Sequence, residues 1–370
     1  MEYRVITFYK YIPIEDPARL RDDFREFCTK NNILGRILIG EEGINGAACG
    51  KSEKIELFKE NIKQNSVFSD LTFRQHEYHE QAYHKLVVRV RKEIVAFGEE
   101  VDLSKKGKYL TPDELKNMLD NKEDLVIIDA RNSYEAKVGK FENAVVLPIE
   151  NFREFPEQIG SLKKYQNKKI VMYCTGGIRC EKASAYLSQN GFGDVYHLKG
   201  GIIDYLDKYP NDHFKGNCFV FDDRLVADTG GELVGKCEIC NQPSTSLINC
   251  HNLECDKLFI CCEKCQKKKC CSIDCMNSPR QRIVRKKLKE IGTVRNYYSK
   301  PKIAEIMIKS DVKIGTNLFF SGETTEEFSV TVKEIRDIHG NNISSAHVGM
   351  VITIPILNKL RKNDMVFIQA

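Results

Sequence analysis

Residues Lys168–Leu187, KKIVMYCTGGIRCEKASAYL, predict a buried strand, a tight loop and a helix in direct succession. The apolar run Ile170–Tyr173 is the predicted strand, Cys174 follows it, and a helix-forming run begins after the loop. A thiol at such a junction faces backbone N–H groups and the positive end of the helix dipole, which both favour the thiolate form. The sequence therefore predicts a nucleophilic Cys174, against the simpler interpretation of an inert buried cysteine at the end of a strand.

The loop after this strand contains the other candidate residues for chemistry. Its two glycines allow it to close around an anion without interference from a Cβ atom. The loop geometry favours Cys174 as the primary thiol, while Cys180 at the helix start is an alternative, either as a resolving thiol or as the primary one. The candidate catalytic residues are Cys174, Arg179 and Cys180, and the candidate anion- or substrate-binding residues are Thr175, Gly176, Gly177 and Ile178.

Length and composition exclude several classes of protein. The 370 residues predict about two or three domains, and the 42% hydrophobic and 29% charged residues are typical of a soluble globular protein. No apolar run approaches the roughly 20 residues of a membrane span, and the start MEYRVITFYK is no signal peptide, so we expect a cytoplasmic protein without membrane contact. The 15 cysteines then indicate metal ligation and thiol catalysis rather than disulfides. No obligatory protein partner is evident.

The first 100 residues favour a ferredoxin-like α+β domain. Four predicted strands alternate with two predicted helices, Asp16–Lys30 and Ser52–Gln64. The glycine-rich segment Glu41–Gly50 (EEGINGAACG) is interpreted as a turn, either a plain loop or one that contacts phosphate. The strands are predicted at Tyr3–Tyr9, at Leu34–Ile39, near Leu71–Gln75 and at Leu86–Val90.

Residues 107–212 form the predicted α/β domain around the Cys174 loop. Apolar runs such as Leu125–Ile128 and Val195–Leu198 alternate with helix signals, as expected of a central, largely parallel sheet. Ligands of such sheets bind outside the carboxyl ends of the strands, which is where Cys174 lies. Asp129 and Arg131 follow another of these strands and are candidate supporting residues.

Residues 213–278 contain four cysteine pairs with the spacing of metal ligands. Eight thiolates suit two tetrahedral zinc sites of four cysteines each, and the two sites can be interleaved. Free thiols in a loop, or an iron–sulfur cluster, are the alternatives, and Cys261, Cys270 and His251 are alternative ligands. The candidate metal ligands are Cys237, Cys240, Cys250, Cys255, Cys262, Cys265, Cys271 and Cys275.

Residues 279–302 form a predicted basic linker, and residues 303–370 a predicted small β-barrel of six strands. Nine Lys or Arg residues and one acid lie between positions 280 and 302, a charge excess that can neutralise RNA phosphates or simply be solvated. Alternating apolar and polar residues separated by turn residues favour the barrel, which resembles those of elongation factors and of collagenase-like peptidases. The candidate RNA-binding residues are Arg280, Arg282, Arg285, Lys286 and Lys287.

Several of these motifs carry a family resemblance. The segments IDARNSYEAKVGKFENAVVLP, YCTGGIR and HLKGGI resemble a rhodanese domain, in which Cys174 matches the catalytic position and Arg179 the basic residue that faces the anion. Asp129 and Arg131 match the first rhodanese signature, whereas Lys140 stands where many rhodaneses have histidine. Together with YKYIPIEDP, LGRILIGEEGING, GGIIDY, VFDDR and the cysteine block, the chain resembles the rhodanese-like tRNA uridine(34) hydroxylases over about residues 1–280. The terminal barrel is an addition to that pattern.

The resemblance implies an oxidoreductase that uses dioxygen as co-substrate to convert the wobble uridine of tRNA to 5-hydroxyuridine. Cys174 and Cys180 are then the reactive thiols, and addition of a thiolate to carbon 6 of uracil would make carbon 5 electron-rich. The residues alone leave two alternatives open: a sulfurtransferase that carries a Cys174 persulfide, and a non-catalytic zinc and RNA-binding module. The sequence has no dinucleotide fingerprint and no two-histidine-one-carboxylate set for an oxygen-activating cofactor.

Overall fold

The computed structural model describes residues 2–278, 288–322, 325 and 328–369. The chain forms two compact units, the first made of Met1–Cys250 and Cys255–Asn277, the second of His251–Glu254 and Ser278–Ala370. Among the described residues, no helix has the length and apolar character that a membrane crossing requires.

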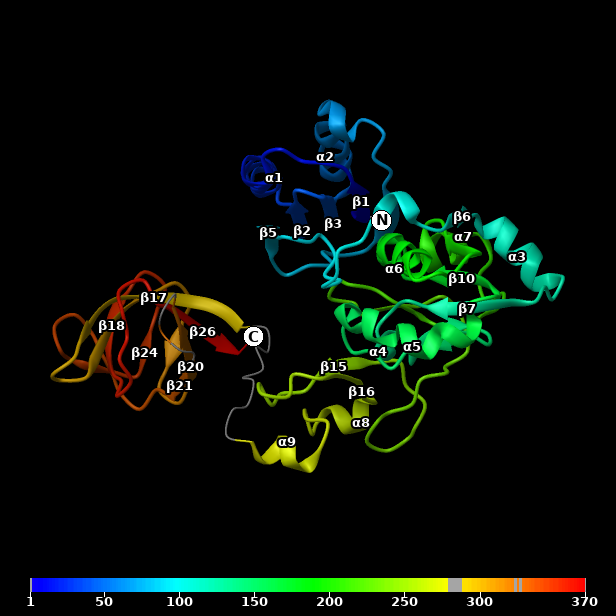
Figure 1. The fold of residues 1–370 in the computed structure, drawn as a ribbon. Helices are drawn as coiled ribbons and strands as arrows, with labels where there is room; N and C mark the ends of the chain where they lie inside the picture. The colour runs from blue at the N-terminus through cyan, green and yellow to red at the C-terminus, as the bar shows by residue number, and fades with distance from the viewer. Residues whose placement is uncertain (1, 279–287, 323–324, 326–327, 370) are drawn as a thin grey trace. The chain divides into compact units, whose positions relative to one another are not determined.

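A β-α-β-β-α-β-β domain begins the first unit (Figure 1). Its sheet has the order β4-β1-β3-β2-β5, in which only β2 and β5 pair in parallel. Both helices pack on the sheet through apolar side chains such as Phe24 and Phe58, which share one core with Ile6 and Ile37. This α+β arrangement agrees with the sequence prediction. The elements are β1 (Tyr3–Tyr11), α1 (Pro17–Lys30), β2 (Leu34–Gly40), β3 (Gly43–Lys51), α2 (Ser52–Gln64), β4 (Arg74–Tyr78) and β5 (Leu86–Val90).

Strand β3 corrects the interpretation of Glu41–Gly50 as a turn. Only the first two residues of that segment lie outside β3, which forms the centre of the sheet between β1 and β2. Glycine is unfavourable in strands, so the composition concealed the element. Here Gly46 is required by packing, because a Cβ atom at this position would lie 2.3 Å from the ring of Phe8.

The second domain is a parallel α/β sheet, as predicted. Its strand order is β6-β11-β10-β7-β9, and every pair in it is parallel. Helix α3 begins at a capping box, because the Thr111 hydroxyl accepts from the Glu114 N–H while the Glu114 carboxylate accepts from the Thr111 N–H. The main elements are β6 (Lys108–Leu110), α3 (Pro112–Asp120), β7 (Leu125–Asp129), α4 (Ser133–Ala136), β9 (Val145–Val146), α5 (Ile159–Leu162), β10 (Lys169–Tyr173), α6 (Ile178–Gln189), β11 (Val195–Leu198) and α7 (Gly201–Lys208).

The cysteine-rich segment follows with short elements only. A two-stranded sheet links β8 (Gly139–Phe141) of the α/β domain to β12 (Phe214–Gly216). Phe219 and Ile260 of the segment share an apolar cluster with Val138 of the α/β domain. The remaining elements are β13 (Cys218–Phe219), β14 (Val226–Ala227), β15 (Leu247–Asn249), β16 (Leu258–Ile260), α8 (Glu263–Gln266) and α9 (Ile273–Asn277).

The second unit is an eight-stranded sheet, with the order β21-β20-β26-β17-β18-β25-β22-β23. The sequence predicted a small barrel of six strands; the sheet instead has eight strands and is open, since β21 and β23 end it without pairing with each other in the described residues. Its strands are β17 (Leu288–Tyr298), β18 (Ile303–Ile308), β20 (Asn317–Ser321), β21 (Phe328–Thr331), β22 (Ile335–Arg336), β23 (Asn342–Ile343), β25 (Val351–Pro355) and β26 (Met365–Gln369), beside a two-stranded sheet of β19 (Val312–Lys313) and β24 (Ser345–Ala346).

Strand β17 also corrects the predicted linker. Residues 288–298 lie in the middle of the sheet and bury Ile291 and Val294 completely or almost completely, so the domain includes part of the segment predicted as a basic linker. Two shifts in the pairing register, after Glu290 and after Val294, interrupt the two-residue alternation of this strand. That interruption, together with the high charge, concealed the strand in the sequence.

Candidate functional site

Cys174 lies at the carboxyl end of β10, immediately before the loop that leads into α6. Its side chain is 1% exposed, and its Sγ accepts a hydrogen bond of 3.0 Å from the Gly177 N–H. The loop is open beside Gly176, where a Cβ atom would have no heavy atom within 4 Å. The Cys174 sulfur is thus buried and contacts the backbone of the predicted loop, while the loop has open space beside Gly176.

The surroundings of the two loop thiols shift their pKa values in opposite directions. Burial raises the pKa of Cys174, but the Cys180 thiol, the Arg179 guanidinium and the N–H groups of Arg179 and Gly177 outweigh this and lower it to about 6. Burial and the neighbouring Cys174 raise the pKa of Cys180 well above its usual value. These surroundings favour the thiolate form of Cys174 at neutral pH, with Cys180 as the thiol that donates to it.

Backbone geometry fixes this loop in place. Gly177 has φ of +97°, a left-handed conformation that favours glycine, and a Cβ atom there would lie 3.0 Å from the Tyr9 hydroxyl. On the other side, the Ile202 N–H at the start of α7 donates to the Cys174 carbonyl at 2.9 Å. The Cys174 carbonyl is therefore bound by α7, while the Gly177 N–H donates to the Cys174 sulfur.

Arg179, which the rhodanese resemblance implies is the basic residue that faces an anion, is held by two side chains of the protein itself. Its guanidinium is 5% exposed and forms a two-pronged ion pair with Glu135, with one hydrogen bond of 2.8 Å, and it also donates to the Thr175 hydroxyl at 3.2 Å. Arg179 therefore acts on Cys174 as a buried, fixed positive charge. The sequence analysis missed Glu135, although it follows Asn132 by three residues in a capping pattern.

Asp129 and Arg131 support the fold rather than line the loop. Both side chains are fully buried, and the Asp129 carboxylate accepts from the Arg131 N–H, Nε and Nη2 groups and from the Tyr173 hydroxyl. Arg131 also donates to the Gly139 carbonyl at 2.7 Å. This network ties the ends of β7 and β10 to β8, and thereby fixes the end of the strand from which the Cys174 loop begins.

The first domain contributes side chains to the site, which sequence reasoning missed. The Tyr9 hydroxyl of β1 donates to the Glu181 carboxylate of α6 at 3.2 Å, and Tyr109 and Lys106 donate to the same carboxylate at 2.6 and 2.8 Å. The next residue, Lys182, donates to Glu42 and Glu93. Because Glu181 and Lys182 are 2% and 4% exposed, the polar face of α6 is covered by these contacts.

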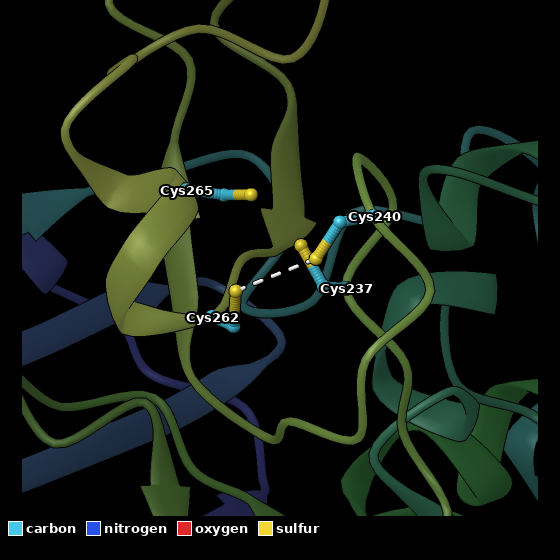
Figure 2. Close-up of side chains that lie close together, drawn as sticks. All are labelled: Cys237, Cys240, Cys262 and Cys265. Atoms are coloured by element: carbon cyan, nitrogen blue, oxygen red, sulfur yellow. Dashed lines mark hydrogen bonds between the residues drawn. The ribbon is translucent and has the colours of Figure 1, made fainter.

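The eight predicted metal ligands lie in two groups of four. Within each group the sulfur atoms all lie within 4.8 Å of one another. Figure 2 shows the first group, in which Cys262 and Cys265 flank the start of α8 and face Cys237 and Cys240, with 3.6 Å between the sulfurs of Cys240 and Cys262. The second group has Cys255 and Cys271 at 3.7 Å. The groups are Cys237, Cys240, Cys262 and Cys265, and Cys250, Cys255, Cys271 and Cys275.

This grouping joins the first cysteine pair to the third and the second pair to the fourth, so the two sites are interleaved along the chain. Four convergent thiols per group form a donor set that suits a tetrahedral metal ion of the zinc class. Cys261 and Cys270 belong to neither group in the described part of the chain. The candidate RNA-binding residues Arg280, Arg282, Arg285, Lys286 and Lys287 lie outside the described residues.

Family models match successive parts of the chain. Residues 3–94 match the UPF0176 acylphosphatase like domain, residues 111–208 the rhodanese-like domain, residues 215–276 the rhodanase C-terminal domain, and residues 287–366 the peptidase family U32 C-terminal domain. The rhodanese resemblance seen in the Cys174 loop is thereby confirmed.

Curated relatives match most of the chain. A tRNA uridine(34) hydroxylase from Protochlamydia amoebophila is 39% identical over 286 residues, which are 75% of this chain and 89% of the relative. Proteins of the same name from Cytophaga hutchinsonii and Chlamydia felis are 40% and 39% identical and are covered to 92% and 89% of their length. The chain belongs to the tRNA uridine(34) hydroxylase family.

Proposed function

We propose that this protein hydroxylates carbon 5 of the wobble uridine in tRNA, with the Cys174 thiolate as its nucleophile. Cys174 is assigned as the nucleophile because its sulfur accepts a hydrogen bond of 3.0 Å from the Gly177 N–H, in surroundings that lower its pKa to about 6. The names of the relatives supply the substrate and the reaction. Since tRNA is the substrate, we place the enzyme in the cytoplasm.

In this proposal the thiolate activates the pyrimidine ring. The Cys174 sulfur donates an electron pair to carbon 6, and the carbon 5–carbon 6 π electrons move onto the adjoining carbonyl as an enolate, which makes carbon 5 nucleophilic. Dioxygen, the co-substrate, supplies one oxygen atom to carbon 5 and releases the other as water, with two electrons and two protons from a reductant of the thiol or nicotinamide class. Loss of the carbon 5 proton then expels the thiolate and restores the double bond.

Sulfur transfer is the second candidate function, because the same loop suits a persulfide. The N–H groups of Gly177 and Arg179 that favour the thiolate would also favour the anionic form of a Cys174 persulfide. Arg179 and Cys180 would act on such a persulfide as they act on the thiolate. The two functions differ in the atom that reaches the nucleoside, which is oxygen in one and sulfur in the other.

Isotope labelling of the oxygen separates these functions. Purified protein, unmodified tRNA, a thiol reductant and thiosulfate as the donor of sulfane sulfur are incubated under heavy-isotope dioxygen, and the wobble nucleoside is analysed by accurate-mass spectrometry. We expect 5-hydroxyuridine that contains the heavy oxygen, because dioxygen is the source of the hydroxyl group. A nucleoside with unlabelled oxygen would overturn the dioxygen step, and a nucleoside with sulfur would establish the transferase. A reaction under nitrogen is the control.

We also propose that each cysteine group binds one zinc ion. All four donors of each group are sulfur, and zinc with four thiolates is a closed structural site, so the ions would hold the segment together and leave the chemistry to Cys174. A catalytic zinc site would instead keep one of its four positions open to water or substrate.

We assign to tRNA binding those basic residues of segment 279–302 that precede β17, which are Arg280, Arg282, Arg285, Lys286 and Lys287. The segment contains nine basic residues against one acid, and tRNA is the substrate of the proposed reaction. Phosphate contacts of this kind give affinity and salt dependence, whereas recognition of the uridine base belongs to the site around Cys174.

A further inference from the structure

The turn between β13 and β14 presents one aromatic ring to solvent. Phe219 and Val226 pair across the two strands, and Phe221 lies in the turn that joins them. Phe219 is 2% exposed, whereas Phe221 is 56% exposed. This turn belongs to the VFDDR motif, residues 220–224, to which the reaction described above gives no role. A single exposed apolar side chain is common on protein surfaces, so its exposure alone indicates nothing.

The turn is held rigidly by its own side chains. The Asp222 carboxylate is 7% exposed and accepts from the Arg224 N–H at 3.1 Å, from its Nε at 2.8 Å and from its Nη2. The Val220 N–H donates to the Leu225 carbonyl at 2.9 Å, and the Leu225 N–H donates to the Asp222 carbonyl at 3.0 Å. These bonds close the turn and fix the backbone on both sides of Phe221.

The first domain holds the same turn from outside. The Tyr83 hydroxyl donates to the Phe221 carbonyl at 3.3 Å, and the Asp223 N–H donates to the Ala82 carbonyl at 3.0 Å. The Arg224 guanidinium also lies over the Tyr78 ring, 5.0 Å from its centroid. The backbone that presents Phe221 is therefore preorganised, and an exposed ring on a rigid support loses little conformational entropy on binding.

The exposed ring stands next to the reactive loop. The Arg179 guanidinium lies over the Phe221 ring, 5.4 Å from its centroid, and the Phe219 ring meets Phe221 edge-on at 5.0 Å. Arg179 is held by Glu135 and by Thr175, the residue after Cys174. A flat apolar surface thus adjoins the loop that contains the thiolate, supported by a buried cation and a buried aromatic ring.

We propose that Phe221 is the platform on which the target pyrimidine stacks, which makes it a determinant of substrate recognition. This inference rests on the proposed hydroxylation, since that function supplies the base. An enzyme that reacts with a base in folded RNA must hold it outside its stack, and aromatic side chains receive such bases. Stacking of a base on an aromatic ring contributes enough to be measured, on the order of tenfold in affinity.

Binding of two anticodon stem-loop RNAs tests the platform. One RNA contains uridine at the wobble position, and the other is abasic there. For the wild-type protein we expect roughly tenfold tighter binding of the uridine RNA. Phe221→Leu, which keeps apolar volume but has no π face, should bring this preference close to one, whereas Phe221→Tyr should retain it. Leu57→Ala on α2, a truncation of another side chain with 45% exposure, is the matched control and should not change it.

The platform would be overturned if Phe221→Leu weakened the binding of both RNAs equally, or if it left the preference for the uridine RNA unchanged. A changed pH dependence of the Cys174 thiolate in Phe221→Leu would also overturn it, because the ring would then act through the loop structure. A failure of the proposed hydroxylation gives a different result from a failure of the platform. If Phe221→Leu loses the preference for the uridine RNA but the wild-type protein inserts no oxygen from labelled dioxygen into the RNA, the platform is supported and the proposed hydroxylation is refuted.

Discussion

Replacement of Cys174 by serine is expected to abolish uridine hydroxylation, with a loss on the order of a thousandfold or more. Serine is nearly isosteric, so the loop and its hydrogen bond from Gly177 should be retained. A hydroxyl group does not ionise near neutral pH and cannot replace the thiolate as a nucleophile toward carbon 6. The measurement is the amount of 5-hydroxyuridine formed per enzyme in a single turnover, with thermal unfolding as the control for folding.

Variants of Cys180 separate its two possible roles. Cys180→Ser keeps a donor toward Cys174, whereas Cys180→Ala removes it, so only alanine should move the acid limb of the pH–rate profile to higher pH. If Cys180→Ser loses activity as completely as Cys174→Ser, then Cys180 takes a chemical part in turnover. Full activity of the double variant Cys174→Ser, Cys180→Ser would refute thiol catalysis in this protein.

Loss of the metal centres should unfold the cysteine-rich segment. The segment has only short strands and helices, and its buried cluster consists mainly of the cysteines together with Phe259. For structural zinc sites the free energy of metal binding is folding free energy, about 10–16 kcal/mol in isolated fingers. We expect a strong chelator to release both ions and expose the segment to limited proteolysis.

Single variants should then remove one ion at a time. Cys262→Ser affects the first group and Cys271→Ser the second, while Cys49→Ser, a buried cysteine of the first domain, should leave both ions bound. Metal analysis by mass spectrometry gives the stoichiometry. Detection of iron and labile sulfide would show that the groups hold an iron–sulfur cluster rather than zinc. A fully folded segment without any metal would contradict the assignment of metal sites.

The local geometry around Cys174 was predictable because it depends on neighbouring residues only. The strand, the glycine loop and the helix are contiguous, so residue types alone indicated a thiol surrounded by N–H groups. The cysteine spacing similarly indicated two sites of four ligands, since sulfur donors have few other uses in such a pattern. What the sequence analysis could not resolve were partners far apart in the chain.

Arg179 and β3 illustrate these limits. The role of Arg179 depends on Glu135, which lies 44 residues earlier, and that of Glu181 on Tyr9, which lies 172 residues earlier. The hydrophobic periodicity of a sequence gives no signal for pairs of residues so far apart in the chain. Strand β3 was missed because it is rich in glycine. At Gly46 the close approach of Phe8 requires glycine, and this contact is visible only once the sheet is formed.

Titration of the Cys174 thiolate tests the central claim most directly. The difference in ultraviolet thiolate absorbance between the wild-type protein and Cys174→Ser is measured from acid to alkaline pH, which cancels the contribution of the metal-binding thiolates. The absorbance difference should rise with a midpoint near 6, because the deprotonated form is favoured in the loop. A midpoint at the ordinary value of 9.0 would show that the loop leaves the thiol protonated at neutral pH, and the proposed nucleophile would be lost.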